Sequence, residues 1–303
     1  MMIRVGVFVK TFWWCIHVMK FRNGLALFMQ NPFFKVMSDI IFSLSNSKVK
    51  ELIKLRESAR RRREQNHFVI EGYPDLKCIF EAGRKVEEIF FCWDLIRKAK
   101  LENEFEEFEK TGVLFTELSK EAFTKASYRK NSDGFISVAH SWPLLLENSI
   151  GEKTQICIVL DEIEKPGNLG AIIRTAEAFG VKSILLSDAV IDCFNPNVIR
   201  SSRGLMSGVN IGMGSKEEIL DFLQNKKFML VGTSGGAQNS YWEQEITSKM
   251  AFVFGSEKNG LGKFWLDQLN CTVNIPMKGN ADSLNLHASV ACILAESNRR
   301  ERN

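Results

Sequence analysis

Residues 271–296 read CTVNIPMKGNADSLNLHASVACILAE, and this stretch decides the fold. A short apolar run at 273–277 enters a polar turn at 278–282. The tripeptide 283–285 follows, before a run of helix formers at 288–296. A strand, a polar loop and a helix start in this order present backbone N–H groups and short polar side chains to a ligand. We therefore expect this loop to bind a ligand.

The second half of the chain alternates strands and helices. Continuous apolar runs are typical of strands buried in a parallel sheet, and such runs lie at 156–160, 183–186, 228–231, 250–254 and 273–277. A helix is predicted at 169–179, followed by Gly180 as its left-handed C′ residue. Ligands of such sheets bind outside the carboxyl ends of the strands. Three polar, glycine-bearing loops follow strands there, at 233–238, 255–262 and 278–285.

The first half predicts a smaller α/β domain at residues 45–140. Strands are expected at 67–72, 89–92, 113–115 and 135–138, with helices at 74–82 and 94–110. Residues 141–153, SWPLLLENSIGEK, mix Pro, Gly and polar residues and are typical of a linker. The second domain would then occupy residues 154–300.

A basic run stands on a helix predicted near the start of the first domain. It consists of four consecutive arginines, Arg60, Arg61, Arg62 and Arg63. A charge run is usually a solvated helix face. Few nearby glutamates offset these cations, so we expect the four arginines to contact nucleic-acid phosphates.

Residues 1–36 differ in composition, with five Lys or Arg residues and no acid. Three interpretations compete: a leader or organelle presequence, an interfacial anchor, and upstream DNA translated from a wrong start codon. The longest uncharged stretch, 11–19, is too short to cross a bilayer, and no small-residue cleavage site stands out. We favour the third interpretation, in which Met37 is the initiator.

The whole-chain composition is that of an ordinary globular protein. With 303 residues, 45% of them hydrophobic and 25% charged, the chain can form two modest cores. The net charge of +4 is compatible with nucleic acid but does not demonstrate it. Seven scattered cysteines without a C-x-x-C pair favour reduced thiols and a cytoplasmic setting. His67 and His140 have no partner at a useful spacing. We therefore expect hydrogen-bonded or exposed histidines without a special role, and no metal cofactor.

The glycine-bearing loops fail the standard nucleotide patterns. Residues 255–260 have the spacing of a P-loop, but Leu261 stands where the lysine is required. No G-x-G-x-x-G follows a strand and opens a helix, so dinucleotide binding is also unsupported. The loops therefore suit a neutral or cationic ligand that is held by backbone groups.

Four segments carry a resemblance to a known family. They are NLGAIIRTAEAFG at 168–180, NPNVIR at 195–200, FGSEKNGL at 254–261, and IPMKG at 275–279 with SLN at 283–285. In this order and spacing they resemble the motifs of the SpoU, or TrmH-type, RNA 2′-O-ribose methyltransferases of the SPOUT superfamily. The first domain is similar to that family's substrate-binding domain, which resembles ribosomal protein L30e.

The resemblance implies an α/β methyltransferase domain with a parallel sheet and a deep trefoil knot, which acts as a homodimer. It also implies S-adenosyl-L-methionine as cofactor and methylation of a ribose 2′-hydroxyl in structured RNA. An L30e-like first domain favours large-subunit, 23S-type rRNA as the substrate. Two alternatives stay open: a tRNA 2′-O-methyltransferase, and a catalytically inactive RNA-binding or ribosome-assembly protein of the same fold.

Catalytic roles follow from the same resemblance. Arg174 would orient the ribose hydroxyl and stabilise its developing alkoxide. A guanidinium is a poor base because its pKa exceeds about 12, so we prefer this role to proton abstraction. Glu257 would orient Arg174 or a neighbouring backbone group, or satisfy a helix dipole. Asn168 and Asn285 would contact the ribose or the arginine, although Asn285 could equally be an N-cap, and Ser283 completes the set.

The cofactor pocket is assigned by the resemblance to the backbone of Gly255, Ile275 and Leu284 and to the side chains of Thr233 and Met277. One departure lies beside this pocket. The family usually continues after Ser-Leu-Asn with Val and a small residue, whereas Leu286 and His287 stand here. A lone histidine at such a position is more often structural than a proton acceptor, so the departure bears on the fine geometry of the site.

Overall fold

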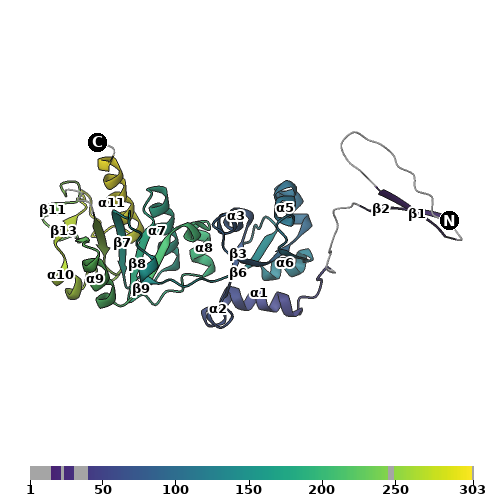
Figure 1. The fold of residues 1–303 in the computed structure, drawn as a ribbon, viewed down its shortest axis with the longest axis horizontal. Coiled ribbons are helices and arrows are strands. Elements are labelled where there is room, and N and C mark those ends of the chain that lie inside the picture. Colours follow the sequence, from purple (N-terminus) through teal and green to yellow (C-terminus); the bar gives the residue numbers. More distant parts are fainter. Residues whose placement is uncertain (1–14, 22–23, 31–39, 245–248, 302–303) are drawn as a thin grey trace.

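The structure, a computed structural model, describes residues 15–21, 24–30, 40–244 and 249–301. Two α/β domains lie side by side, and the amino-terminal strands β1 (Cys15–Phe21) and β2 (Gly24–Gln30) pair antiparallel (Figure 1). Most of residues 1–36 lie outside the described residues, so their interpretation stays a prediction. Within the described residues, no helix has the length and apolar character needed to cross a membrane.

The first domain is built on a four-stranded sheet in the order β3-β6-β4-β5. Its elements are α1 (Ser47–Glu57), α2 (Ala59–Gln65), β3 (His67–Glu71), α3 (Tyr73–Glu81), β4 (Val86–Phe91), α4 (Trp93–Ala99), α5 (Glu102–Glu109), β5 (Leu114–Glu117), α6 (Lys120–Ala126) and β6 (Phe135–His140). Because successive strand residues face opposite sides, the sheet has two apolar faces. Helices α1 and α6 cover one face, and α3, α4 and α5 cover the other.

The single helix predicted at 94–110 is wrong, since the structure has α4 and α5 there. Lys100 adopts the left-handed conformation, with φ at 60°, and ends α4. The N–H groups of Lys100 and Leu101 bond to the carbonyls of Arg97 and Ile96, both at 3.1 Å. This C-terminal cap is a backbone event that the charge pattern of the segment does not reveal.

The second domain contains a seven-stranded sheet in the order β11-β13-β10-β12-β7-β8-β9, in which all pairs are parallel. Its elements are η1 (Leu146–Asn148), β7 (Ile156–Asp161), α7 (Pro166–Ala178), β8 (Ser183–Ser187), α8 (Pro196–Ser202), η2 (Leu205–Gly208), β9 (Asn210–Gly214), α9 (Lys216–Asn225), β10 (Met229–Thr233), β11 (Asn239–Ser240), β12 (Met250–Phe254), α10 (Lys263–Gln268), β13 (Cys271–Asn274) and α11 (Leu286–Glu301). The predicted parallel α/β sheet is thus confirmed.

Period-two burial separates the two faces of the large sheet. Ile156, Ile158 and Leu160 of β7 pack with α7, α8 and α11 in one core. Cys157 and Val159, on the opposite side of the same strand, pack with α9 and α10 in another. The helices therefore sandwich the sheet, as the placement of α11 and α9 on either side of it in Figure 1 also shows. This scaffold holds the carboxyl ends of the strands in fixed positions.

An ion pair between the domains corrects one sequence prediction. Arg62, whose side chain is only 4% exposed, pairs with Asp192 of the second domain at 2.6 Å. Its Nη1 also donates to the backbone carbonyls of Leu55, at 2.5 Å, and Arg56, at 3.0 Å. The prediction that Arg62 contacts RNA is therefore wrong, because its charge and its donors are used inside the protein.

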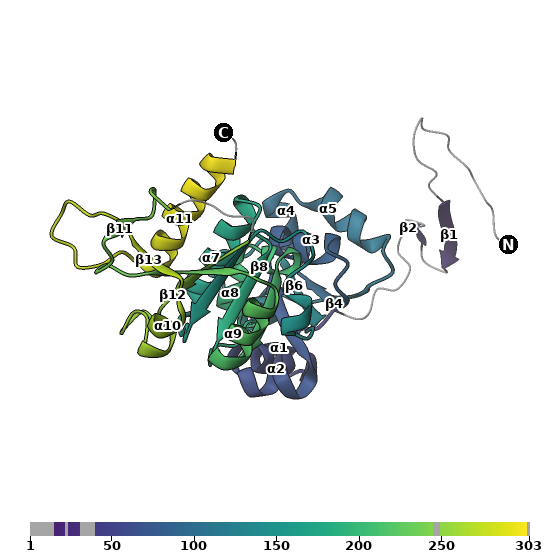
Figure 2. The same cartoon turned by 60° about the vertical axis from the view of Figure 1, so that its left-hand side comes forward.

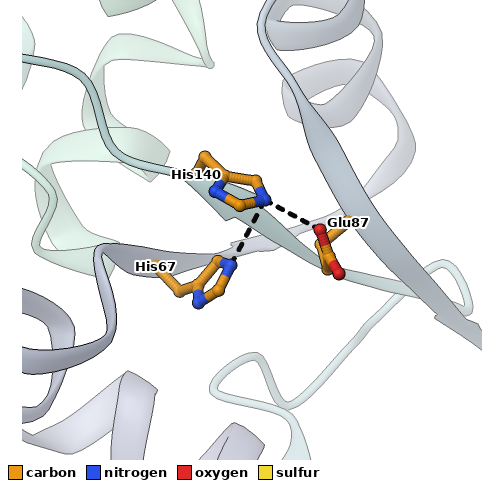
Figure 3. A group of neighbouring side chains, drawn as sticks. All are labelled: His67, Glu87 and His140. Atoms are coloured by element: carbon orange, nitrogen blue, oxygen red, sulfur yellow. Dashed lines mark hydrogen bonds and ion pairs between the residues drawn. The ribbon is translucent and has the colours of Figure 1, made fainter.

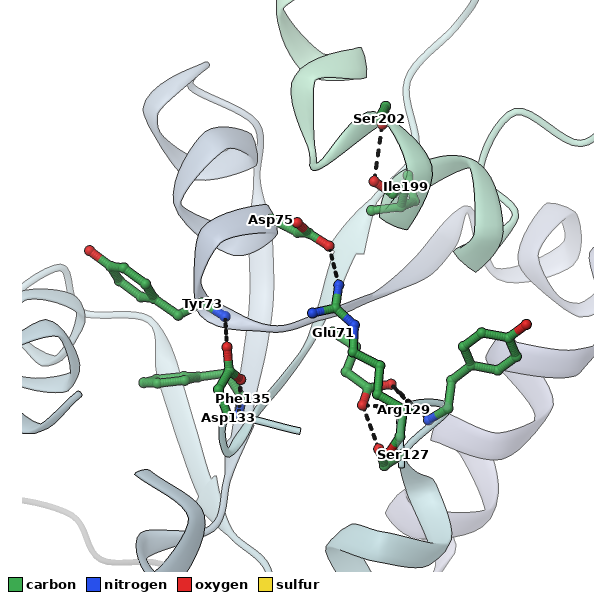
Figure 4. Close-up of polar contacts among 10 residues, drawn as sticks. Glu71, Tyr73, Asp75, Ser127, Arg129, Asp133, Phe135, Ile199 and Ser202 are labelled. Carbon is green, nitrogen blue, oxygen red and sulfur yellow. Dashed lines mark hydrogen bonds and ion pairs between the residues drawn. The ribbon is translucent and has the colours of Figure 1, made fainter. Parts of the chain in front are cut away.

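A polar network lies at the base of α8, where the first domain meets the second (Figure 4). The carboxylate of Glu71 accepts from the Ser127 hydroxyl and the backbone N–H of Arg129. The Arg129 guanidinium donates to Asp75 at 2.5 Å. Burial raises the pKa of Asp75 to about 6, although Arg129 acts in the opposite direction. Gly204 touches this region so closely that a Cβ there would lie 2.5 Å from the Asp75 carbonyl oxygen.

We predict that Arg62→Ala destabilises the protein strongly, while Arg63→Ala does not. Removing Arg62 leaves the carboxylate of Asp192, only 14% exposed, without its partner, which costs about 3 kcal/mol. Arg63 is exposed on the same helix, so its loss should change the free energy of unfolding by less than about 0.5 kcal/mol. Urea denaturation of the two variants measures the difference. Equal stabilities would contradict the structural role of Arg62.

Candidate active site

Four loops meet at one edge of the large sheet. Strands β13, β10, β12 and β7 are consecutive neighbours and all parallel, so their carboxyl ends share that edge. The loops that follow these strands are 275–285, 234–238, 255–262 and 162–165. The loop between β13 and α11 extends beyond the sheet in Figure 2. The expectation that the three polar loops lie together is confirmed, and the loop before α7 joins them.

A chain of hydrogen bonds connects three of the four segments that carry the family resemblance. The amide Nδ2 of Asn285 donates to Oδ1 of Asn168 at 3.4 Å. The amide Nδ2 of Asn168 in turn donates to Oε1 of Glu257 at 2.5 Å. Asn285 also accepts the backbone N–H of His287 through Oδ1, at 2.9 Å, as an N-cap does. Residues that lie far apart in the sequence therefore form one continuous polar contact.

Two ion pairs join the loop after β7 to the loop after β12. Lys165 pairs with Glu257, whose side chain is only 13% exposed. Lys258 pairs with Glu164 at 3.0 Å, in a more exposed position. Each loop thus supplies one cation and one anion to the other. This arrangement compensates the charge of the shielded Glu257 and fixes its carboxylate beside Asn168.

Arg174 lies exposed on α7. Within the described residues its side chain forms no hydrogen bond or ion pair. Pairing with Arg174, one of the roles expected for Glu257, is therefore not seen among the described residues, because Asn168 and Lys165 occupy the carboxylate. The guanidinium stays available to a group from outside this chain.

The histidine at position 287, where the family usually has a small residue, forms a contact between two helices. Its Nε2 lies 2.8 Å from Oγ1 of Thr175, the residue after Arg174. This contact joins the start of α11 to α7, two helices that pack against each other in the apolar core. A histidine that holds two helices together agrees with the structural role favoured from the sequence.

Gly255 is required by the turn that it opens. Ser256 and Gly260 exchange two backbone hydrogen bonds, at 3.0 and 2.9 Å, which close the loop tightly. A Cβ on Gly255 would lie 2.0 Å from the carbonyl carbon of Gly260 and 2.2 Å from the nitrogen of Leu261. Only glycine allows the backbone to approach itself so closely.

The remaining pocket residues lie along the same edge. Ile275 is half-buried, whereas Met277 and Leu284 are both 38% exposed. Thr233 ends β10, and its hydroxyl donates to the Val253 carbonyl at 3.3 Å. Ser283 lies exposed in the last loop. The edge therefore combines polar loop groups with an accessible apolar surface.

The other three arginines of the basic run differ in the ion pairs that their side chains form. Arg60 pairs with Glu64 at 2.7 Å on the outer surface of α2. Arg61 forms a bidentate pair with Glu51, through bonds of 2.7 and 2.8 Å. Arg63 is exposed, and no ion pair involves it among the described residues. A contact with nucleic acid thus stays a prediction for Arg60, Arg61 and Arg63.

Lys165 is the site residue that the sequence interpretation missed. It precedes Pro166 and is the N-cap residue of α7. Its position in a loop that follows a buried strand at the ligand-binding edge was the available signal. Which residues of the two loops pair depends on β7 and β12 being neighbours, and the sequence does not show this.

Comparisons with known proteins give a consistent result. Residues 155–295 match the model of the SpoU rRNA Methylase family, and residues 46–137 match the MRM3-like substrate binding domain. A solved RNA 2′-O ribose methyltransferase is 32% identical, with a TM-score of 0.75, and the match covers 87% of this chain and 99% of that one.

Two further relatives extend the comparison. The 23S rRNA (guanosine(2553)-2′-O)-methyltransferase RlmP of Bacillus subtilis is 27% identical, over 84% of this chain and 97% of that protein. The SpoU methyltransferase AviRb from Streptomyces viridochromogenes, solved in complex with AdoMet, has a TM-score of 0.74 at 20% identity, and the match covers 85% of this chain and 99% of that one. The latter likeness establishes a shared fold.

We predict that Gly255→Ala lowers the free energy of unfolding by at least about 2 kcal/mol, because the added Cβ forces backbone atoms apart. Gly235→Ala is the matched control, since a Cβ there has no neighbour within 4 Å; its effect should stay below about 0.5 kcal/mol. Thermal unfolding followed by circular dichroism compares the two. A Gly255 variant as stable as the control would show that the loop does not need this close approach.

Proposed function

The chain belongs to the SpoU rRNA methylase family and is an RNA 2′-O-ribose methyltransferase, and from this premise we propose its cofactor, substrate and residue roles. The cofactor is S-adenosyl-L-methionine, and the RNA is large-subunit, 23S-type rRNA. The observation that carries the proposal is the chain of hydrogen bonds from Asn285 through Asn168 to Glu257. It joins three of the four family-like segments at the edge where a parallel sheet binds its ligand.

The loops at this edge fit S-adenosyl-L-methionine. When bound, the cofactor supplies a methyl group on a positively charged sulfur. Backbone groups at Gly255, Ile275 and Leu284 would hold its adenosine, while Thr233 and Met277 would line the pocket. The exposed apolar surface of Met277 and Leu284 suits an adenine ring. The absence of a phosphate-binding lysine, with Leu261 in its place, agrees with a cationic ligand.

We assign to Arg174 the role of binding the ribose 2′-hydroxyl. A 2′-hydroxyl is a weak nucleophile, so it reacts faster when a cation stabilises the negative charge that develops on its oxygen. Arg174 is exposed and free of partners among the described residues, so its guanidinium can meet an RNA group. It would bind the hydroxyl oxygen and the neighbouring phosphate, since the guanidinium presents several N–H donors in one plane.

Glu257, Asn168 and Asn285 act as positioning residues in this proposal. The buried end of Glu257 is fixed by Lys165, and it holds the amide of Asn168. Asn168 and Asn285 then present their remaining donor and acceptor atoms to the ribose. Ser283, exposed in the last loop, would contact the same sugar.

We also propose that the protein is a homodimer. The support is that the Arg174 side chain has no partner in its own chain among the described residues. In the dimer, the last loop of one protomer and Arg174 of the other would face the same substrate. The deep trefoil knot is also part of the proposal. Its support is the contact of Asn285, in the last loop, with Asn168 and through it with the loop of Glu257.

The preference for rRNA rests on the first domain and on relatives that carry it. The match of residues 46–137 to a substrate-binding domain supports RNA capture by this part of the chain. RlmP, which is named for 23S rRNA, aligns over both domains. Arg60, Arg61 and Arg63 would contact RNA phosphates on the surface of α2. The cytoplasm is the proposed location, where free thiols would stay reduced; they are those of Cys78, Cys92, Cys157, Cys193, Cys271 and Cys292.

We predict that Arg174→Ala lowers kcat about a hundred- to a thousandfold, since it removes a group that stabilises developing charge. Binding of S-adenosyl-L-methionine, measured by calorimetry, should not change. Arg97→Ala is the control, because Arg97 is an exposed arginine of the first domain. If the wild-type chain binds no S-adenosyl-L-methionine, the alternative of an inactive RNA-binding protein of this fold replaces the enzyme.

The choice between RNA classes has its own test. We predict that cells lacking this chain lose one 2′-O-methylation in large-subunit rRNA and keep every 2′-O-methylation in tRNA. Sequencing that detects 2′-O-methyl positions, applied to both RNA classes, measures the outcome. Loss of a tRNA mark alone would overturn the rRNA assignment.

A further inference from the structure

Two histidines and a glutamate come together on the first domain, away from the candidate active site (Figure 3). His67 begins β3, His140 ends β6 and Glu87 lies on β4. One nitrogen from each ring and one carboxylate oxygen all lie within 4.8 Å of one another. The two histidines, which have no partner at a useful spacing in the sequence, are therefore neighbours in the fold.

Sheet register explains why the sequence spacing hides this cluster. His67 and His140 are directly opposite in the antiparallel pair of β3 and β6, although 73 positions separate them. Glu87 falls at a break in register between β4 and β6, where Val86 pairs with Ala139 and Glu88 with Val138. Glu87 is thus the extra residue of a bulge, which turns its side chain towards His140.

We propose that His67, Glu87 and His140 bind one divalent transition-metal ion, with Zn²⁺ as the preferred ion. The Nε2 atoms of His67 and His140 are 3.4 Å apart. Two nitrogens about 2.05 Å from a tetrahedral zinc ion are separated by about 3.3 Å. The two imidazoles are therefore already spaced as adjacent ligands of such an ion.

The carboxylate needs only a small adjustment to complete the set. Glu87 Oε2 lies 2.7 Å from Nε2 of His140, closer than two ligands of one metal ion. The Glu87 side chain is 49% exposed, so it can rotate outward to make room. Lys85 Nζ, 3.8 Å from the same oxygen and 71% exposed, can move into solvent. Two imidazoles and one carboxylate leave the fourth position to water.

The position of the cluster indicates what the metal would do. His67 directly follows α2 and Asn66, the left-handed residue that ends this helix. His140 is the last residue of β6, before the segment that leads to the second domain. A metal ion would clamp the points where the chain enters and leaves the sheet. It would stabilise the first domain and take no part in methyl transfer.

Calorimetric titration of the full chain with Zn²⁺ alone tests this assignment. We expect one Zn²⁺ per chain at His67, Glu87 and His140 and a Tm that rises with Zn²⁺ concentration. His67→Gln and His140→Gln should each weaken binding at least tenfold, and Glu87→Gln severalfold. Co²⁺ in place of Zn²⁺ should give the visible absorption of a tetrahedral complex, which a merely structural histidine pair would not produce.

Two control variants keep the test specific. His287→Gln removes a histidine of the second domain, and Glu81→Gln removes an exposed carboxylate of the first. Both should bind Zn²⁺ as the unaltered chain does. Binding that is absent, or that persists unchanged in His67→Gln and His140→Gln, overturns the proposal. If the histidine variants do not fold, unchanged Zn²⁺ binding by Glu87→Gln overturns it as well.

Discussion

The parallel register of β13, β10, β12 and β7 is the constraint on which the candidate site depends. Because these strands are neighbours and point the same way, the loops that follow them must emerge together. Asn168, Glu257 and Asn285 come into hydrogen-bond contact for this reason. Two apolar cores, one on each face of the sheet, hold the strands in place. Apolar residues of the sheet and its helices thus hold the polar residues of the site in position.

Some charged side chains of this protein are paired within the chain, and others are left exposed. At the site, the charges of Lys165 and Glu257 compensate each other, while no group in the described part of the chain pairs with the Arg174 side chain. Between the domains, Arg62 and Asp192 form a shielded pair that fixes the first domain on the second. A buried pair of this kind is costly to break. The basic run therefore joins a structural arginine to exposed ones within one short helix.

The sequence predicts the site better than it predicts the first domain. The segments around Arg174, Glu257 and Asn285 follow or adjoin buried strands, and a parallel sheet brings such segments to one edge. The step of about 100° per residue fixes the relative directions of the four arginines. Which of them faces Asp192 depends on how α2 packs against the second domain, and the basic run alone does not show that. The meeting of His67 and His140 depends on strand register, which a single sequence does not specify.

Methyl transfer from labelled S-adenosyl-L-methionine to rRNA tests the central claim most directly. The product RNA is hydrolysed with alkali, which cleaves only next to a free 2′-hydroxyl. We predict that the label is recovered in alkali-resistant dinucleotides and disappears with Arg174→Ala. Label in mononucleotides, which would place the methyl group on a base, or no transfer at all, would contradict it.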